Sequence, residues 1–298
     1  MFPGIALLCL LAIFPGTAAG EIRVQDDLGQ SIVLPGPAKR IISLYGAFNE
    51  ILAGMGLTHS IVARTKADEL PGLDDRPGIG THMRPNVELV LGLAPDVVLQ
   101  IGGRRGALLA VEQISAHGIP VAVFSPVTVD ELFSVIVRIG RLTREEEKAL
   151  SLIERMKVRL DAVRCRLQDL TSRPSVFFEV RYPNLLGAGQ GSIVNDVIVR
   201  AGGVNCVRSE KKIVRLGEEA LLGLNPDAYV VQKGPMNANP LPPSKRPIFK
   251  SLKAVQAGRV FEVDEKLYSR PGPRIVRAVE ELAKFLHPEI MRDTKALQ

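Results

Sequence analysis

Basic and aromatic side chains gather in short segments that follow apolar, strand-like runs of the sequence. The candidates are Tyr45, Arg104, Arg105, Arg181, Tyr182, Tyr268 and Arg270. The segments that carry them contain almost no acidic residue. Aromatic rings supply contact area, and an arginine binds a carboxylate or phosphate through two parallel hydrogen bonds. The set predicts a site for a large, partly aromatic, negatively charged ligand.

His82 is the histidine best placed to ligate a metal. It lies among turn residues in the segment from Gly80 to Pro85, whereas His59, His117 and His287 fall at expected helix ends or turns. An imidazole in such a loop could ligate the metal inside a bound chelate. The other interpretation is an ordinary loop histidine. A carrier of free metal ions would need three or four His and carboxylate ligands, and the candidate loops supply one histidine.

Sequence signatures of catalysis are missing. The chain has no HExxH, CxxC, Walker A or GxSxG motif, and the glycine-rich stretch from Gly187 to Ser192 does not match GxGxxG. That stretch predicts a turn before a helix capped by Ser192. A cofactor-dependent α/β enzyme, the alternative from another class, would need an acid–base or nucleophile constellation that the sequence does not show. We therefore expect no catalysis and no cofactor.

The chain alternates β-rich runs with helix-like runs, a pattern typical of α/β folds with parallel sheets. Predicted strands are Arg40–Leu44, Ser60–Ala63, Asp96–Gln100, Pro120–Phe124, Ser175–Val180, Ala228–Gln232 and Arg259–Val263. Predicted helices are Asn49–Gly54, Val87–Leu93, Leu108–His117, Ser192–Ala201, Glu218–Leu224 and Ile275–Leu286. In open α/β sheets, ligands bind beyond the carboxyl ends of the strands. The basic and aromatic candidates follow those ends.

A long amphipathic helix is predicted in the middle of the chain. Apolar residues from Ala149 to Leu170 recur at alternating steps of four and three, which predicts one continuous stripe. Thr143 and Glu146 have the spacing of a capping box, and Pro174 follows the predicted end. About 27 residues at ~1.5 Å rise give a rod of ~40 Å, long enough to bridge two lobes.

The two halves of the chain contain a related segment. NVELVLGLAPDVVL, from Asn86 to Leu99, and GEEALLGLNPDAYV, from Gly217 to Val230, share six of fourteen aligned residues. Each predicts a helix, a Pro-Asp turn and a strand. One copy on each side of the long helix predicts two similar lobes with a cleft between them.

The beginning of the chain predicts export. Residues 5–14 are almost wholly apolar, and small residues up to Gly20 suit a signal peptidase, so we expect a signal peptide over residues 1–20. No later apolar run approaches 18 residues, which predicts a soluble mature protein. We expect an N-terminal lobe over 21–142, a linking helix over 143–171 and a C-terminal lobe over 172–298, with Cys165 and Cys206 unpaired.

The composition argues against nucleic acid as a partner. The 298 residues carry a formal net charge of +6, but Lys and Arg are scattered along the chain. Aromatic residues make up 5% of the chain and tryptophan is absent, so no stacking platform for bases is predicted. We expect no nucleic-acid partner.

These features together resemble the helical-backbone class of ABC-transporter solute-binding proteins, in the branch that handles ferric siderophores, haem and cobalamin. The likeness extends over about residues 40–286 and rests on RIISLYGAFNEILAGMG (Arg40 to Gly56), the NVELVLGLAPDVVL segment, the strand that begins at Gly118, and RPGPR (Arg270 to Arg274). The resemblance implies two α/β lobes joined by a rigid helix, with limited hinge motion. It also implies a periplasmic monomer that delivers its ligand to an ABC permease dimer with its ATPase.

The resemblance further implies that one glutamate on each lobe docks onto arginine clusters of the permease. The matching positions are Glu88 and Glu219, which are also equivalent in the internal repeat. A two-fold permease presents two equivalent basic pockets, and a pseudo-symmetric protein can offer one carboxylate to each. The alternative is two ordinary surface glutamates.

The family leaves the ligand open among a ferric siderophore, a corrinoid, haem and a small oxyanion such as molybdate. Its cobalamin binders hold the corrin with tryptophans, one of them at the position of His82, and this chain has none. Its haem binders use a Tyr or His ligand, for which Tyr45, Tyr182, Tyr268 and His82 are candidates. The arginine-rich loops favour an anionic ferric chelate.

Overall fold

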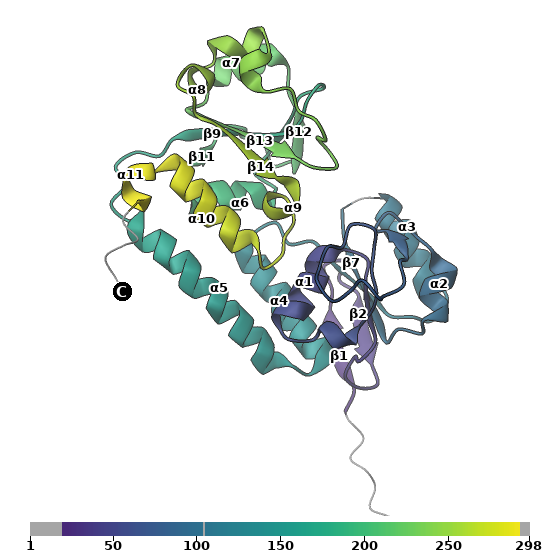
Figure 1. Cartoon of the computed structure of the whole chain (residues 1–298). Coiled ribbons are helices and arrows are strands. Elements are labelled where there is room, and N and C mark those ends of the chain that lie inside the picture. Colours follow the sequence, from purple (N-terminus) through teal and green to yellow (C-terminus); the bar gives the residue numbers. More distant parts are fainter. Residues whose placement is uncertain (1–19, 104, 293–298) are drawn as a thin grey trace, which may run out of the picture.

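The computed structural model describes residues 20–103 and 105–292. The predicted signal peptide therefore lies outside the described residues apart from Gly20, and so does Arg104. Two sheets, each covered by helices, form the two ends of the molecule, and a long helix runs beside both (Figure 1). Within the described residues, no helix combines the length and the apolar character needed to cross a membrane.

The first sheet is parallel and has the order β4-β3-β7-β8. Its strands are β3 (Ile41–Ser43), β4 (Ile61–Ala63), β7 (Val97–Ile101) and β8 (Val121–Phe124). The helices of this half are α1 (Gly46–Gly54), η1 (Thr58–Ser60), α2 (Val87–Gly92) and α3 (Arg105–Ser115). Two small hairpins complete it: β1 (Ile22–Gln25) with β2 (Ser31–Leu34), and β5 (Gly80–Thr81) with β6 (Arg84–Pro85).

The second sheet has the order β12-β10-β9-β13-β14, with β11 also paired to β9. The strands β9, β11, β13 and β14 run parallel, whereas β10 and β12 are antiparallel additions at one edge. The strands are β9 (Ser175–Arg181), β10 (Leu186–Ala188), β11 (Val204–Asn205), β12 (Ile213–Arg215), β13 (Ala228–Lys233) and β14 (Val260–Asp264). The helices are α6 (Ile193–Arg200), α7 (Glu218–Leu224), η2 (Pro243–Lys245), η3 (Ile248–Ser251), α8 (Lys253–Gln256), α9 (Glu265–Tyr268), α10 (Ile275–Leu286) and α11 (Pro288–Met291).

The connection between the halves contains two helices, α4 (Val129–Thr143) and α5 (Glu146–Arg166). The long amphipathic helix is confirmed, but it spans 21 residues and is shorter than the range 143–171 that was predicted. The predicted capping box is wrong. Thr143 is the last residue of α4, where its hydroxyl donates to the carbonyl oxygens of Ile139 and Gly140 at 3.0 Å. Arg144 then turns the chain with a φ of 53°, and α5 begins without a side-chain cap.

The aspartate of the repeated Pro-Asp pair has the same structural role in both sheets. Asp96 accepts hydrogen bonds from the backbone N–H groups of Lys39 and Arg40, just before β3, at 2.7 and 2.8 Å. Asp227 accepts from the N–H and the hydroxyl of Ser175, at the start of β9, both at 2.8 Å. Each aspartate fixes the start of the neighbouring parallel strand, and this explains why the repeat keeps it.

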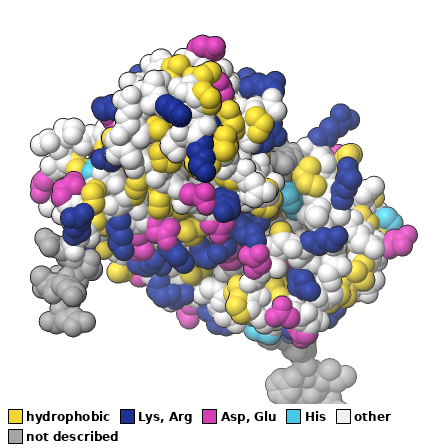
Figure 2. All heavy atoms as spheres, turned by 45° about the horizontal axis from the view of Figure 1, so that its top comes forward, with side chains coloured by type: hydrophobic (Ala, Val, Ile, Leu, Met, Phe, Trp, Pro, Cys, Tyr) yellow, Lys and Arg dark blue, Asp and Glu magenta, His cyan; other side chains and the backbone are white. Residues whose placement is uncertain are grey.

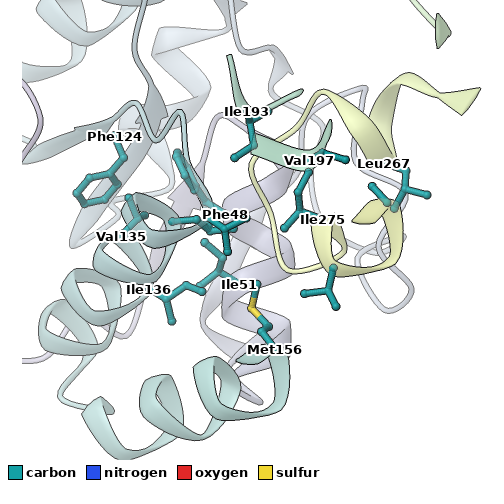
Figure 3. Packing of buried hydrophobic residues seen from close by; sticks show 14 of the residues in the cluster. Phe48, Ile51, Phe124, Val135, Ile136, Met156, Ile193, Val197, Leu267 and Ile275 are labelled. Carbon is teal, nitrogen blue, oxygen red and sulfur yellow. The ribbon is translucent and has the colours of Figure 1, made fainter. Parts of the chain in front are cut away.

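One apolar core continues from the first half into the second. Phe48 of α1 and Val135 of α4 belong to the same buried cluster as Ile193 of α6 and Ile275 of α10 (Figure 3). Met156 of α5 joins this cluster from the side of the long helix. Moving the halves far apart would expose this surface at a cost of roughly 25 cal/mol per Å², so the core favours small relative movement.

Candidate ligand site between the lobes

Tyr45 stands where the first sheet meets the second half of the molecule. It follows β3, forms the N-cap position of α1 and is half-buried. Ser43 fixes the backbone here because its hydroxyl donates to the carbonyl oxygen of Tyr45 at 2.6 Å. The Tyr45 ring packs edge-on against Phe48, with ring centroids 5.9 Å apart, so the core orients the ring.

His82 lies beside Tyr45. The ring centroids are 5.7 Å apart and the planes meet at 78°. The buried side chain of Gln100, in β7, donates to the His82 carbonyl oxygen at 2.7 Å and ties this loop to the sheet. His82 is half-buried, so its imidazole keeps some access to solvent.

Arg270 reaches this pair from the second half of the chain. Its guanidinium carbon lies 6.0 Å from the centroid of the Tyr45 ring, within reach of a cation–π interaction. Its Nη1 donates to the carbonyl oxygen of Ala67 at 3.5 Å, a long hydrogen bond to the first half. Tyr45, His82 and Arg270 therefore form one group with members from both lobes, which we call the inter-lobe triad.

Ion pairs flank the inter-lobe triad and join the two halves. Arg274 binds Glu50 at 2.6 Å, and Lys266 binds Glu69. The hydrogen bond from Lys266 lowers the pKa of Glu69, and the hydrogen bond to Glu50 raises the pKa of Arg274. Figure 2 shows basic and acidic side chains mixed along the belt where the halves meet. The boundary between the two halves is thus polar around the aromatic and cationic inter-lobe triad.

Arg105 belongs to the first lobe, on a helix whose start packs against the His82 loop. It is exposed and begins α3, and a Cβ added to the next residue, Gly106, would stand 2.8 Å from Cε of Met83. The start of α3 therefore packs closely on the loop that carries His82. Arg104, which was predicted to bind the ligand together with Arg105, lies outside the described residues.

Tyr182 follows β9, as predicted, whereas Arg181 is still the last residue of that strand. The structure places Tyr182 in a separate group. The Tyr182 ring lies under the guanidinium of Arg246, with 3.8 Å from the guanidinium carbon to the ring centroid. Its hydroxyl donates to Glu218 at 3.2 Å. Arg181 is half-buried, and its Nε has no hydrogen-bond partner among the described residues. Tyr182 thus packs with Arg246 and Glu218 of its own lobe.

Tyr268 corrects a prediction. The sequence places it in a cleft loop, but its side chain is 0% exposed and belongs to the core cluster. It packs against Phe178 and Phe261, with ring centroids 6.2 and 6.5 Å away. Burial raises the pKa of its hydroxyl, followed by the charge of Glu281. In this structure Tyr268 supports α9 from within and does not face a ligand.

Two residues that the sequence analysis missed, Arg215 and Glu218, line a hollow with Tyr182. The hollow has a volume of about 600 Å³, and Asn184, Leu185 and Leu216 also line it. We call it the Tyr182 hollow. Arg215 ends β12 and Glu218 begins α7. Arg215 stands just before the repeat helix and Glu218 is its first residue, and these positions do not distinguish them from ordinary surface residues.

A second hollow, of about 670 Å³, lies between β1 and α4. Arg138, one of its lining residues, is already bound to Asp27 at 2.5 Å and to the carbonyl oxygen of Gln25 at 3.2 Å. These contacts join the N-terminal hairpin to α4, which gives this hollow a structural explanation.

Glu88 and Glu219 occupy the same place in α2 and α7. Each is the second residue of its helix and is exposed, and neither carboxylate forms an ion pair with another described residue. Figure 1 shows α2 and α7 on the sides of their lobes that face away from α5. A carboxylate in the first turn of a helix is favoured by the helix dipole, which gives both residues a local role as well.

The described ranges 20–103 and 105–292 contain no group of three or more His, Cys, Asp or Glu side chains arranged to hold a metal ion. Cys165 and Cys206 are both free thiols, and burial raises the pKa of Cys206 to about 12. Ligation of a chelated metal by His82 remains a prediction.

Comparison with known proteins places this geometry among related binding proteins. Residues 41–267 match the family model described as periplasmic binding protein. An uncharacterized ABC transporter substrate-binding lipoprotein of Bacillus subtilis, YvrC, is 29% identical over 282 residues, covering 93% of this chain and 89% of the relative. A cobalamin-binding protein of Halobacterium salinarum is 26% identical over 279 residues, covering 89% and 74%. The solved structure of a possible iron-binding (periplasmic solute-binding) protein from Staphylococcus epidermidis has a TM-score of 0.73 and 26% identity, covering 84% of this chain and 99% of that one.

Proposed function

The chain belongs to the periplasmic binding protein family, and from this premise we propose that it captures a metal chelate between its two lobes. The ligand is an iron chelate of the siderophore type or a corrinoid, and the protein hands it to the membrane permease of an ABC importer. The protein performs no chemical step of its own. It acts outside the cytoplasm, as a monomer and without nucleic acid.

The observation that carries this proposal is the inter-lobe triad. Aromatic and cationic groups from both lobes converge within 6.0 Å of one ring, that of Tyr45, which lies just beyond the carboxyl end of β3. A ligand held there contacts both halves at once, and the Tyr45 and His82 rings offer flat surface to a chelate. The names of the relatives, which include cobalamin-binding and possible iron-binding proteins, support the same class of ligand.

Delivery uses the two carboxylates of the repeat. Glu88 and Glu219 project from equivalent positions of α2 and α7 and lack an ion-pair partner among the described residues. A permease dimer with two equivalent basic pockets can take one carboxylate in each. The permease and its ATPase are therefore the expected macromolecular partners.

Absorption spectroscopy tests the proposal directly. Purified protein is titrated with ferric citrate, haemin and cyanocobalamin, each of which has its own visible spectrum. Saturable binding of an iron chelate or of the corrinoid, with a spectral change at one equivalent, is the expected result. Absence of binding to every probe contradicts the proposal.

A further inference from the structure

The Tyr182 hollow lies at the ligand-facing edge of the second sheet. Strands β9, β13 and β14 are parallel, so their carboxyl ends share one edge. Tyr182 follows the end of β9, and α9 with Arg270 follows the end of β14. The edge that sends Arg270 to the first lobe therefore also carries the hollow.

The polar lining of the hollow combines one cation and one anion. Arg215 is exposed, forms no ion pair within the described residues, and donates to the side-chain oxygen of Asn184 at 3.3 Å. Glu218 accepts from the Tyr182 hydroxyl at 3.2 Å. Leu185 and Leu216 add apolar surface to the lining. The hollow is thus close to neutral and offers both a donor and an acceptor.

The buried arginine behind Tyr182 does not change this balance. Arg246 is 1% exposed and forms a bidentate ion pair with Glu179, which is 0% exposed. Its charge is neutralised inside the lobe, where Tyr229 also hydrogen bonds Glu179 at 2.6 Å. Arg246 instead holds the Tyr182 ring in place at the hollow, because its guanidinium stacks on that ring.

A carboxylate that entered this hollow would meet Glu218 as a like charge. It would gain hydrogen bonds from Arg215, but the Glu218 carboxylate would repel it. The Tyr182 hydroxyl could not compensate, because it already donates its hydrogen bond to Glu218. Burial and then the charge of Glu218 raise the pKa of Tyr182, so the hydroxyl stays a donor at neutral pH. A carboxamide fits both groups, since its N–H donates to Glu218 and its oxygen accepts from Arg215.

We infer that the Tyr182 hollow is a subsite for a neutral, carboxamide-bearing edge of the ligand and selects against a carboxylate there. This inference rests on the proposed function and narrows its ligand class. The charge of the inter-lobe triad does not conflict with it, because the triad and the hollow hold different parts of a large ligand.

Two corrinoids with the same ring test the inference. Dicyanocobinamide carries carboxamide side chains, whereas in dicyanocobyrinic acid the same side chains end in carboxylates. Binding of both is measured by isothermal titration for wild type, Glu218→Gln and Arg215→Gln. Glu210→Gln and Arg208→Gln serve as matched controls, because these exposed residues lie outside the hollow. Thermal unfolding confirms that each variant is folded.

The expected result is a wild type that prefers the carboxamide corrinoid by about tenfold or more. Glu218→Gln strengthens binding of the carboxylate corrinoid by about tenfold and changes the carboxamide form little, while Arg215→Gln weakens both. The inference is overturned if wild type prefers the carboxylate form or shows no preference, or if Glu218→Gln shifts both ligands equally. It is also overturned if ferric citrate binds and neither corrinoid does, an outcome that leaves the proposed function standing. The proposed function itself fails only if ferric citrate, haemin and cyanocobalamin also show no binding.

Discussion

The guanidinium of Arg270 and the ring of Tyr45 lie 6.0 Å apart, although they belong to opposite halves of the chain. The loop after α9 brings Arg270 to the first lobe, and the α1 N-terminus presents Tyr45 to it. A ligand at this point must interact with both halves.

Removing either member of this pair is expected to weaken ligand binding. Arg270→Gln removes the cation and Tyr45→Leu removes the ring, and each is expected to cost ~1–2 kcal/mol, which is about tenfold in the dissociation constant. The double variant should cost less than the sum, because both act on the same ligand. Titration of whichever chelate binds wild type measures this, with Lys284→Gln on α10 as the control. Full affinity in the double variant would contradict the site.

Removing the two repeat glutamates is expected to separate transport from binding. Glu88→Gln with Glu219→Gln should abolish uptake by cells that depend on this protein, because the docking charges are lost. Ligand affinity should stay at the wild-type value, since both residues lie outside the triad. Glu112→Gln, an exposed glutamate on α3, is the control. If the double variant loses ligand binding, the docking assignment is wrong.

Tyr268→Phe is expected to leave ligand affinity unchanged. The residue is 0% exposed, and its hydroxyl has no hydrogen-bond partner among the described residues. Removing a buried, unpaired hydroxyl should be neutral or should raise the free energy of unfolding by up to ~1 kcal/mol. Urea unfolding and ligand titration of the same sample measure both effects. A marked loss of ligand affinity would show that Tyr268 does belong to the ligand site.

Asp227 is expected to link stability to acid pH. The hydrogen bond from Lys253 chiefly lowers its pKa, to about 2 from an ordinary 3.8, with burial opposing and Ser175 adding to the effect. Because the folded-state pKa is the lower one, this stabilisation is complete above about pH 4 and is lost as the pH falls through about 2. Asp227→Asn should therefore lower the melting temperature at pH 7 by several degrees and reduce the change between pH 4 and 2. Calorimetry across that range checks this, and identical pH profiles for variant and wild type would contradict it.

Much of the fold could be predicted from the sequence because its elements are strongly patterned. The strands β3, β7, β9 and β13 are short apolar runs bounded by turn residues, and each was predicted within one or two residues. The repeat predicted two related halves, and the roles of Asp96 and Asp227 now give it a physical cause. The predicted lobe boundaries stay predictions.

Other features depended on contacts between distant residues and left weak signals. A Thr-x-x-Glu spacing fits both the end of α4 and the start of α5. The sequence did not predict the left-handed turn at Arg144, because a positive φ is normally expected at glycine. Tyr268 looked like a ligand residue because an aromatic ring after a strand suits either a cleft or a core. Arg215 and Glu218 become notable only because folding brings them to one hollow with Tyr182.

Hydrogen exchange with and without the bound chelate shows whether the ligand is captured between the lobes. We expect one ligand to slow exchange both in the first-lobe segments around Tyr45 and His82 and in the second-lobe segment from Leu267 to Gly272. The exposed face of α5 should be unaffected. Protection confined to one lobe, or located away from these segments, would contradict capture between the lobes.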